Sequence, residues 1–75
     1  MQSRTSDFYL TCYLTLVGEQ IKSVKRLDHK KLEFEFGDSN KFNKLKDQFF
    51  WNQAQVDPLA FSDQIKKIKT IIYNN

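Results

Sequence analysis

The hydrophobic residues in the last third of the chain recur at the spacing of one face of an α-helix. They are four, three and four residues apart, in the order Phe61, Ile65, Ile68 and Ile72. Asp57 can cap the first turn, and Pro58 suits the first helical position because its missing N–H needs no partner there. Val56 and Phe61 occupy the two positions of a hydrophobic staple. The pattern predicts a helix that begins at Pro58 and runs on to Tyr73.

Residues 8–17 fit two periodicities. In a helix that follows Thr5-Ser6-Asp7 and ends at Gly18, one broad face would carry Tyr9, Leu10, Tyr13, Leu14, Leu16 and Val17. In a strand, β-forming Tyr and Thr residues would alternate with Phe8, Leu10, Cys12, Leu14 and Leu16. The capping residues favour the helix. We therefore predict a helix over residues 8–17 and keep the strand as the alternative.

Two strands are predicted next, over residues 19–27 and 31–37, joined by a turn at residues 28–30. The first alternates imperfectly, because its apolar residues cannot share one face without a β-bulge: Ile21, Val24 and Leu27. The second alternates cleanly, with Leu32, Phe34 and Phe36 on one face and Lys31, Glu33 and Glu35 on the other. Together they predict a β-hairpin whose apolar face must be covered by helices.

A second C-terminal helix is predicted from about Asn40 to Trp51. Gly37-Asp38-Ser39 ends the preceding strand and caps this helix, and its core stripe is Phe42, Leu45 and Phe49. The predicted fold class is α+β, a single domain over residues 1–75. It has an N-terminal helix, a two-stranded antiparallel hairpin, and two C-terminal helices packed on one face of the hairpin. Residues 1–4 and 74–75 are expected to fray.

Composition limits the class of protein. The 75 residues carry a formal net charge of +3, and no apolar run approaches the roughly 20 residues that a membrane-spanning helix needs. The N-terminal residues do not read as a signal peptide. The single cysteine, Cys12, cannot form a disulfide within the chain. We therefore expect a soluble cytoplasmic protein that does not act on membranes.

The residues that most often carry catalysis or bind metals are sparse. His29 is the only histidine and falls in a predicted turn, so it is no basis for a metal site or a catalytic triad. Cys12 is expected to be a small apolar group. Glu33 and Glu35 share a strand face, and we interpret them as partners in ion pairs with the basic residues on the opposite strand. We predict no catalytic residue, no metal, no cofactor and no enzymatic activity.

Two surfaces are candidates for binding a partner. The first is the basic hairpin, whose side chains would contact the phosphates of a nucleic acid: Lys22, Lys25, Arg26, Lys30 and Lys31. Lys44 and Trp51 would be further contacts with the nucleic acid. The second is a set of aromatic residues for a protein partner, which includes a homodimer: Phe50, Trp51 and Tyr73. Trp51 serves either surface only if it is exposed. The alternative is that it folds back onto Val56 or Leu59.

Four segments together resemble a family of small proteins. They are Thr5-Ser6-Asp7-Phe8-Tyr9-Leu10, Leu16-Val17-Gly18, Leu32-Glu33-Phe34-Glu35-Phe36 and Val56-Asp57-Pro58. The resemblance covers nearly the whole chain. Members of this family occur in bacteria and in their phages or mobile elements, and the family is classified as a domain of unknown function. The resemblance implies an αββα-type fold and no known activity. It transfers no functional residues to this chain.

Overall fold

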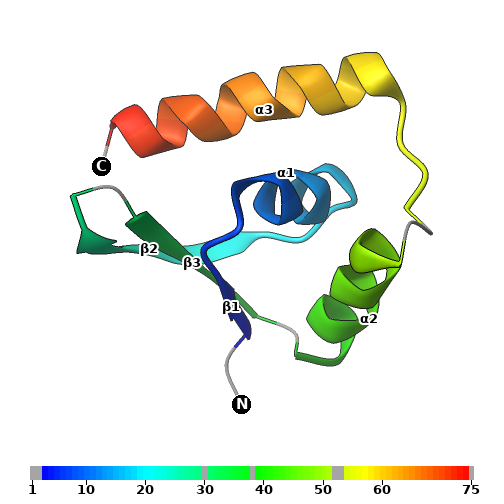
Figure 1. The fold of residues 1–75 in the computed structure, drawn as a ribbon, viewed down its shortest axis with the longest axis horizontal. Helices are drawn as coiled ribbons and strands as arrows, with labels where there is room; N and C mark the ends of the chain where they lie inside the picture. The colour runs from blue at the N-terminus through cyan, green and yellow to red at the C-terminus, as the bar shows by residue number, and fades with distance from the viewer. Residues whose placement is uncertain (1–2, 30, 38, 52–53, 75) are drawn as a thin grey trace.

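Six elements make up the chain in the order β-α-β-β-α-α, in a computed structural model that describes residues 3–29, 31–37, 39–51 and 54–74. They are β1 (Ser3–Thr5), α1 (Phe8–Leu16), β2 (Ile21–Asp28), β3 (Lys31–Phe36), α2 (Ser39–Phe50) and α3 (Pro58–Tyr73) (Figure 1). The predicted α+β class is confirmed. In the part of the chain that the structure describes, no helix is long and apolar enough to cross a membrane.

The sheet has three antiparallel strands in the order β1-β3-β2. Phe34 is at its centre, opposite Thr5 of β1 and Val24 of β2. The register between β2 and β3 shifts twice, between Ile21 and Ser23 and again between Arg26 and Asp28. The first shift confirms a bulge, because it lets Ile21 and Val24 both stand opposite buried phenylalanines of β3. Leu27 does not join this face: it is 44% exposed, so the expectation is wrong for this residue.

β1 is a strand that sequence reasoning did not predict. Residues 1–4 were expected to fray, but Ser3 and Arg4 belong to β1 and Ser3 is buried, so that expectation is wrong for these two residues. The physical reason is that β3 has two edges and the hairpin satisfies only one, which leaves the other free to pair. At the other end, Asn74 caps α3. Residues 1, 2 and 75 lie outside the described residues.

α1 is a helix, which decides between the two periodicities of this segment. The Asp7 side chain accepts a hydrogen bond from the Leu10 N–H at 3.0 Å, as the capping residues predicted. Gly18 has φ 105°, a conformation that favours glycine, and follows the end of the helix as expected.

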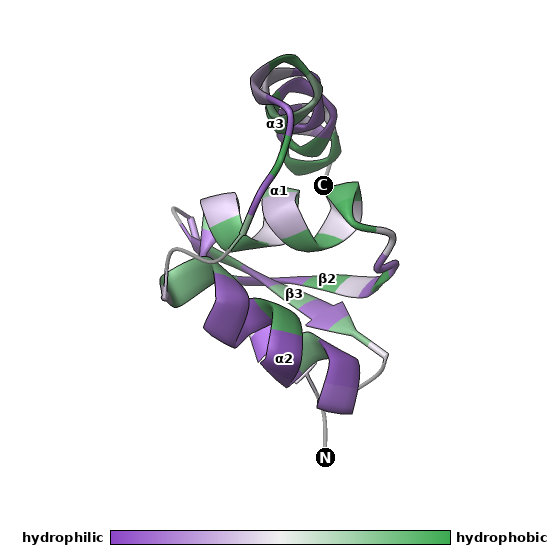
Figure 2. Ribbon diagram, turned by 90° about the vertical axis from the view of Figure 1, so that its right-hand side faces the viewer, coloured by the Kyte–Doolittle hydropathy of each residue, from purple (hydrophilic) through white to green (hydrophobic). Residues whose placement is uncertain are grey.

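The single broad face predicted for α1 is wrong. Tyr9 and Val17 are exposed, whereas all five residues from Leu10 to Leu14 are buried. Figure 2 shows why, because α1 lies between the sheet on one side and α3 on the other. A helix covered on two sides is apolar around most of its circumference and has no single hydrophobic stripe.

The other two helices complete the core. Asp57 caps α3 by accepting a hydrogen bond from the Ala60 N–H at 3.1 Å, and Ile68 is the one α3 residue among those described that is fully buried. α2 packs through Phe42 against Phe36, with ring centres 5.7 Å apart, and through Phe49 against Tyr13. Asp38, predicted to cap α2, lies outside the described residues. The core therefore forms where α1 meets the sheet, α2 and α3.

Candidate functional site

The outer face of the sheet carries carboxylates that already have partners. Arg4 lies 3.8 Å from both Glu33 and Glu35, and the Ser23 hydroxyl donates a 2.8 Å hydrogen bond to Glu35. Lys25 stands directly opposite Glu33 in the register. The two carboxylates are thus part of a cross-strand polar network, in which Arg4 is a member that sequence reasoning missed because β1 was not predicted.

The basic hairpin residues are exposed but do not share one face. Lys25 points to the outer face with Glu33, whereas Arg26 stands opposite the buried Leu32, on the other side of the hairpin. Lys22 falls at the first bulge, beside Gly37. Lys31 is exposed and stands opposite Asp28, and Lys30 lies outside the described residues. Acidic partners in the register and the split between faces both dilute the positive charge of this hairpin.

Exposed aromatic residues gather where α2 ends. Trp51, directly after α2, is 75% exposed, and Phe50 is 56% exposed. Folding of Trp51 back onto Val56 or Leu59 is therefore not what the structure shows. The Phe50 ring contacts Phe49 edge to face at 5.5 Å, which ties the exposed pair to the core.

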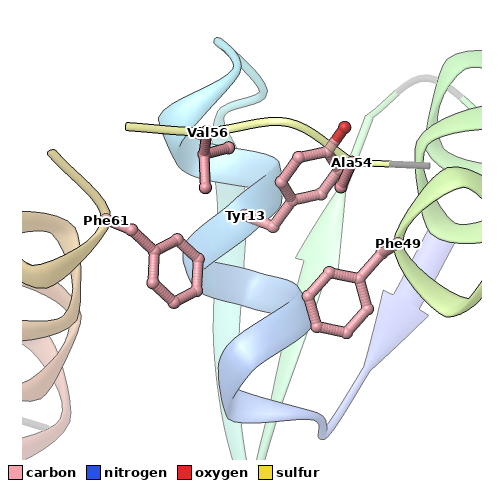
Figure 3. Close-up of a pocket in the computed structure, with 5 residues that line it drawn as sticks. All are labelled: Tyr13, Phe49, Ala54, Val56 and Phe61. Carbon is pink, nitrogen blue, oxygen red and sulfur yellow. The ribbon is translucent and has the colours of Figure 1, made fainter. Parts of the chain in front are cut away.

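An apolar pocket of about 330 Å³ has Phe49, the residue before this exposed pair, in its lining. Figure 3 shows its lining, contributed by α1, α2, the connector after α2, and the first turn of α3: Tyr13, Phe49, Ala54, Val56 and Phe61. At its edge, the Tyr13 hydroxyl donates a 3.3 Å hydrogen bond to Gln48. We call Phe50, Trp51 and this pocket the aromatic corner. The sequence did not predict this pocket, although two of its five lining residues, Val56 and Phe61, were predicted to pack together as a hydrophobic staple.

The structure separates candidates that the sequence had grouped. The hairpin turn and the C-terminal end of α3 lie on one side of the molecule, and α2 ends on the opposite side (Figure 1). Tyr73, 85% exposed at the end of α3, is therefore far from Phe50 and Trp51. Trp51 is likewise apart from the hairpin turn, and Lys44 is exposed along α2. The aromatic corner and the basic hairpin are two distinct surfaces.

A comparison with family models matches residues 2–74 to a domain of unknown function, DUF5659. The chain belongs to this family. Neither a curated protein nor a solved structure matches it. Membership of DUF5659 covers all six elements and confirms the resemblance carried by the capping and packing segments, and it assigns no activity to any residue.

The titratable groups that sequence analysis singled out are placed as follows. His29 is exposed in the turn after β2. Among the described residues, no group of three His, Cys, Asp or Glu side chains is arranged to hold a metal ion. Cys12 is completely buried, and burial, with a smaller contribution from Asp7, raises the pKa of its thiol from 9.0 to about 11. The thiol is thus protonated at neutral pH and is a packing group in the folded chain.

This raised pKa predicts a loss of stability in alkali. The folded chain keeps the Cys12 proton up to about pH 11, whereas the unfolded chain loses it near pH 9, so the stabilisation is complete below pH 9 and is lost as the pH rises to 11. The difference in pKa corresponds to about 2–3 kcal/mol. Between pH 9 and pH 11, the free energy of unfolding of wild type should fall by this much more than that of Cys12→Ala. Urea unfolding under reducing conditions at each pH measures the difference. Parallel losses in the two proteins would contradict the assignment.

Proposed function

We propose that this DUF5659 domain is a non-enzymatic module that binds a protein partner through the aromatic corner. The observation that carries the proposal is Trp51, an indole 75% exposed directly after a helix whose Phe49 lines an apolar pocket. Tryptophan and neighbouring apolar pockets are typical centres of binding energy in protein interfaces, because burying the large ring on association removes much apolar surface from water.

The corner supplies both halves of an apolar contact. Phe50 and Trp51 project outward and offer rings that a partner's pocket can enclose, and the pocket between Phe49 and Phe61 offers space for an apolar side chain of the partner. The edge-to-face contact with Phe49 restricts the orientation of the Phe50 ring in the unbound protein, which lowers the entropy cost of binding. A second copy of the chain is one partner that this chemistry fits, which makes a homodimer one form of the proposal.

Trp51→Ala should weaken partner binding at least about 30-fold, the effect of losing a central aromatic anchor worth 2 kcal/mol or more. The measurement is affinity capture followed by titration of the captured partner, with sedimentation to detect self-association. Tyr73→Ala is the matched control, since Tyr73 is also an exposed aromatic and ends α3, and α2 and α3 end on opposite sides of the molecule (Figure 1). A strictly monomeric protein that recovers no partner counts against the proposal. So does an equal loss of binding in Tyr73→Ala.

A second candidate function is nucleic-acid binding through the basic hairpin, and exposed Lys22, Lys25, Arg26 and Lys31 favour it. Such binding would rest on phosphate contacts and weaken steeply with salt. Lys25→Glu combined with Arg26→Glu should then abolish oligonucleotide binding at low salt. Trp51 emission should stay that of a water-exposed indole during the titration, because α2 ends on the side away from the hairpin turn. Unchanged binding in the double variant would rule out the hairpin as the site.

A further inference from the structure

One face of the second half of α3 carries two lysines and a tyrosine. Lys66, Lys69 and Tyr73 are three and four residues apart, so they share one face of the helix. This face points away from Ile68, which is buried. Both lysines are exposed, and Tyr73, at 85%, is the most exposed large hydrophobic residue in the part of the chain that the structure describes. We call these three residues the Lys–Tyr face.

Positive charge gathers around this end of α3. Asp63 lies in the first half of the helix, whereas the second half adds Lys67 to the lysines of the Lys–Tyr face and has no acidic residue. The hairpin turn lies on the same side of the molecule as the C-terminal end of α3 (Figure 1). Beside this turn are the exposed Arg26 and Lys31 and, between them in the sequence, the acidic Asp28. Among these residues basic groups outnumber acidic ones, which favours a polyanionic partner.

The ring of Tyr73 decides which polyanion this face fits. A planar ring exposed beside ammonium groups can stack on an unpaired base while the lysines contact the neighbouring phosphates. In a duplex the bases stack on one another, so a single strand is favoured. An anionic membrane fits less well, because a helix that lies in a membrane surface inserts its apolar face. In α3 that face packs against the core through Ile65, Ile68 and Ile72.

We propose that the Lys–Tyr face binds single-stranded nucleic acid, with Lys66 and Lys69 on the phosphates and Tyr73 stacked on a base. The stacking residue is thus Tyr73 and not Trp51, because α2 and α3 end on opposite sides of the molecule and Tyr73 is the ring that accompanies these lysines (Figure 1). The site shares its class of partner with the basic hairpin but uses a different element. It does not depend on the aromatic corner.

The test titrates a fluorescein-labelled oligo(dT) strand with the full-length protein and follows fluorescence anisotropy at a series of low salt concentrations. Tyr73→Ala should weaken binding about 5- to 150-fold, the effect of losing one stacked base, while Tyr73→Phe keeps the ring and should keep most of the affinity. Lys66→Glu combined with Lys69→Glu should weaken binding and lower the salt slope by about two. Thermal unfolding should be nearly unchanged in all these variants, since the three side chains are exposed.

Two matched variants make the test specific. Tyr9→Ala makes the same chemical change at an exposed tyrosine of α1 and should leave the affinity unchanged. Lys25→Glu combined with Arg26→Glu makes the same change in net charge on the hairpin and should weaken binding less than the double lysine variant of α3. The Lys–Tyr face is overturned if Tyr73→Ala binds like wild type, or if the hairpin variant loses as much affinity as the α3 variant. A loss confined to the hairpin variant would keep the basic hairpin as the site, and no binding by wild type would contradict both.

Discussion

Phe34→Ala is expected to lower the free energy of unfolding by about 3–5 kcal/mol, the usual cost of truncating a buried phenylalanine. Phe34 is only 2% exposed and occupies the centre of the middle strand, opposite Thr5 and Val24. Its loss leaves a cavity under α1 that neighbouring strands cannot close without breaking their pairing. Since small domains are stable by about 5–15 kcal/mol in total, the variant should be close to unfolding at physiological temperature.

Urea unfolding followed by circular dichroism measures this effect. Phe50→Ala is the control, since it makes the same chemical change at a position that is 56% exposed, and it should cost less than about 1 kcal/mol. If the two variants are equally stable, or if Phe34→Ala unfolds like wild type, the core assigned to the inner face of the sheet is wrong.

Ile68→Ala should cost about 2–5 kcal/mol, as for other isoleucines truncated in a core. Ile68 is 1% exposed and is the most deeply buried anchor of α3. The loss falls on the contact between α3 and α1, so its effect should be largest in α3. Amide hydrogens of α3 should exchange much faster in this variant, while those of β3 stay protected at low urea.

Hydrogen exchange resolved along the chain, together with thermal unfolding, separates these outcomes. Tyr73→Ala is the control, because it truncates a residue of the same helix that is 85% exposed, and it should leave both measurements nearly unchanged. A variant Ile68→Ala that is as stable as wild type would overturn the placement of the α3 stripe. Equal loss of protection in α3 and β3 would keep the core assignment and contradict an effect confined to α3.

Helix α3 and the hairpin were predictable because their signals are local and agree with one another. The α3 stripe, the Asp57 cap and Pro58 all indicate the same start and the same buried face, and the structure confirms the cap at 3.1 Å. In β3, every second residue is apolar, and Leu32, Phe34 and Phe36 are all buried. An element that buries one face leaves a clear period in the sequence.

α1 was ambiguous for the opposite reason. It contacts the sheet on one side and α3 on the other, so buried positions occur consecutively from Leu10 to Leu14 and no single period dominates. Only the capping residues at its two ends, Asp7 and Gly18, distinguished helix from strand. Even so, the face predicted for α1 included Tyr9 and Val17, which are exposed, because the sequence does not show that two different layers cover one helix.

The sequence named the candidate aromatic residues but neither their exposure nor their grouping. The exposure of Trp51 was left open and was decided by the structure. That α2 and α3 end on opposite sides of the molecule follows from the direction in which each helix runs. The pocket at the aromatic corner joins segments 48 residues apart, from Tyr13 to Phe61, and no local pattern encodes that meeting.

By itself, the sequence determined the start of α3, the approximate extent of α2 and of the hairpin, which face of β3 is apolar, and the family to which the chain belongs. These properties depend on neighbours within about four positions, through caps, turns and side-chain periodicity. The tertiary structure alone decided the pairing of β1, the two-sided burial of α1, the split of the basic hairpin between two faces, and the pocket between Tyr13, Phe49 and Phe61. Each of these depends on contacts between residues far apart in the chain, whose free energy exists only once the whole fold has formed.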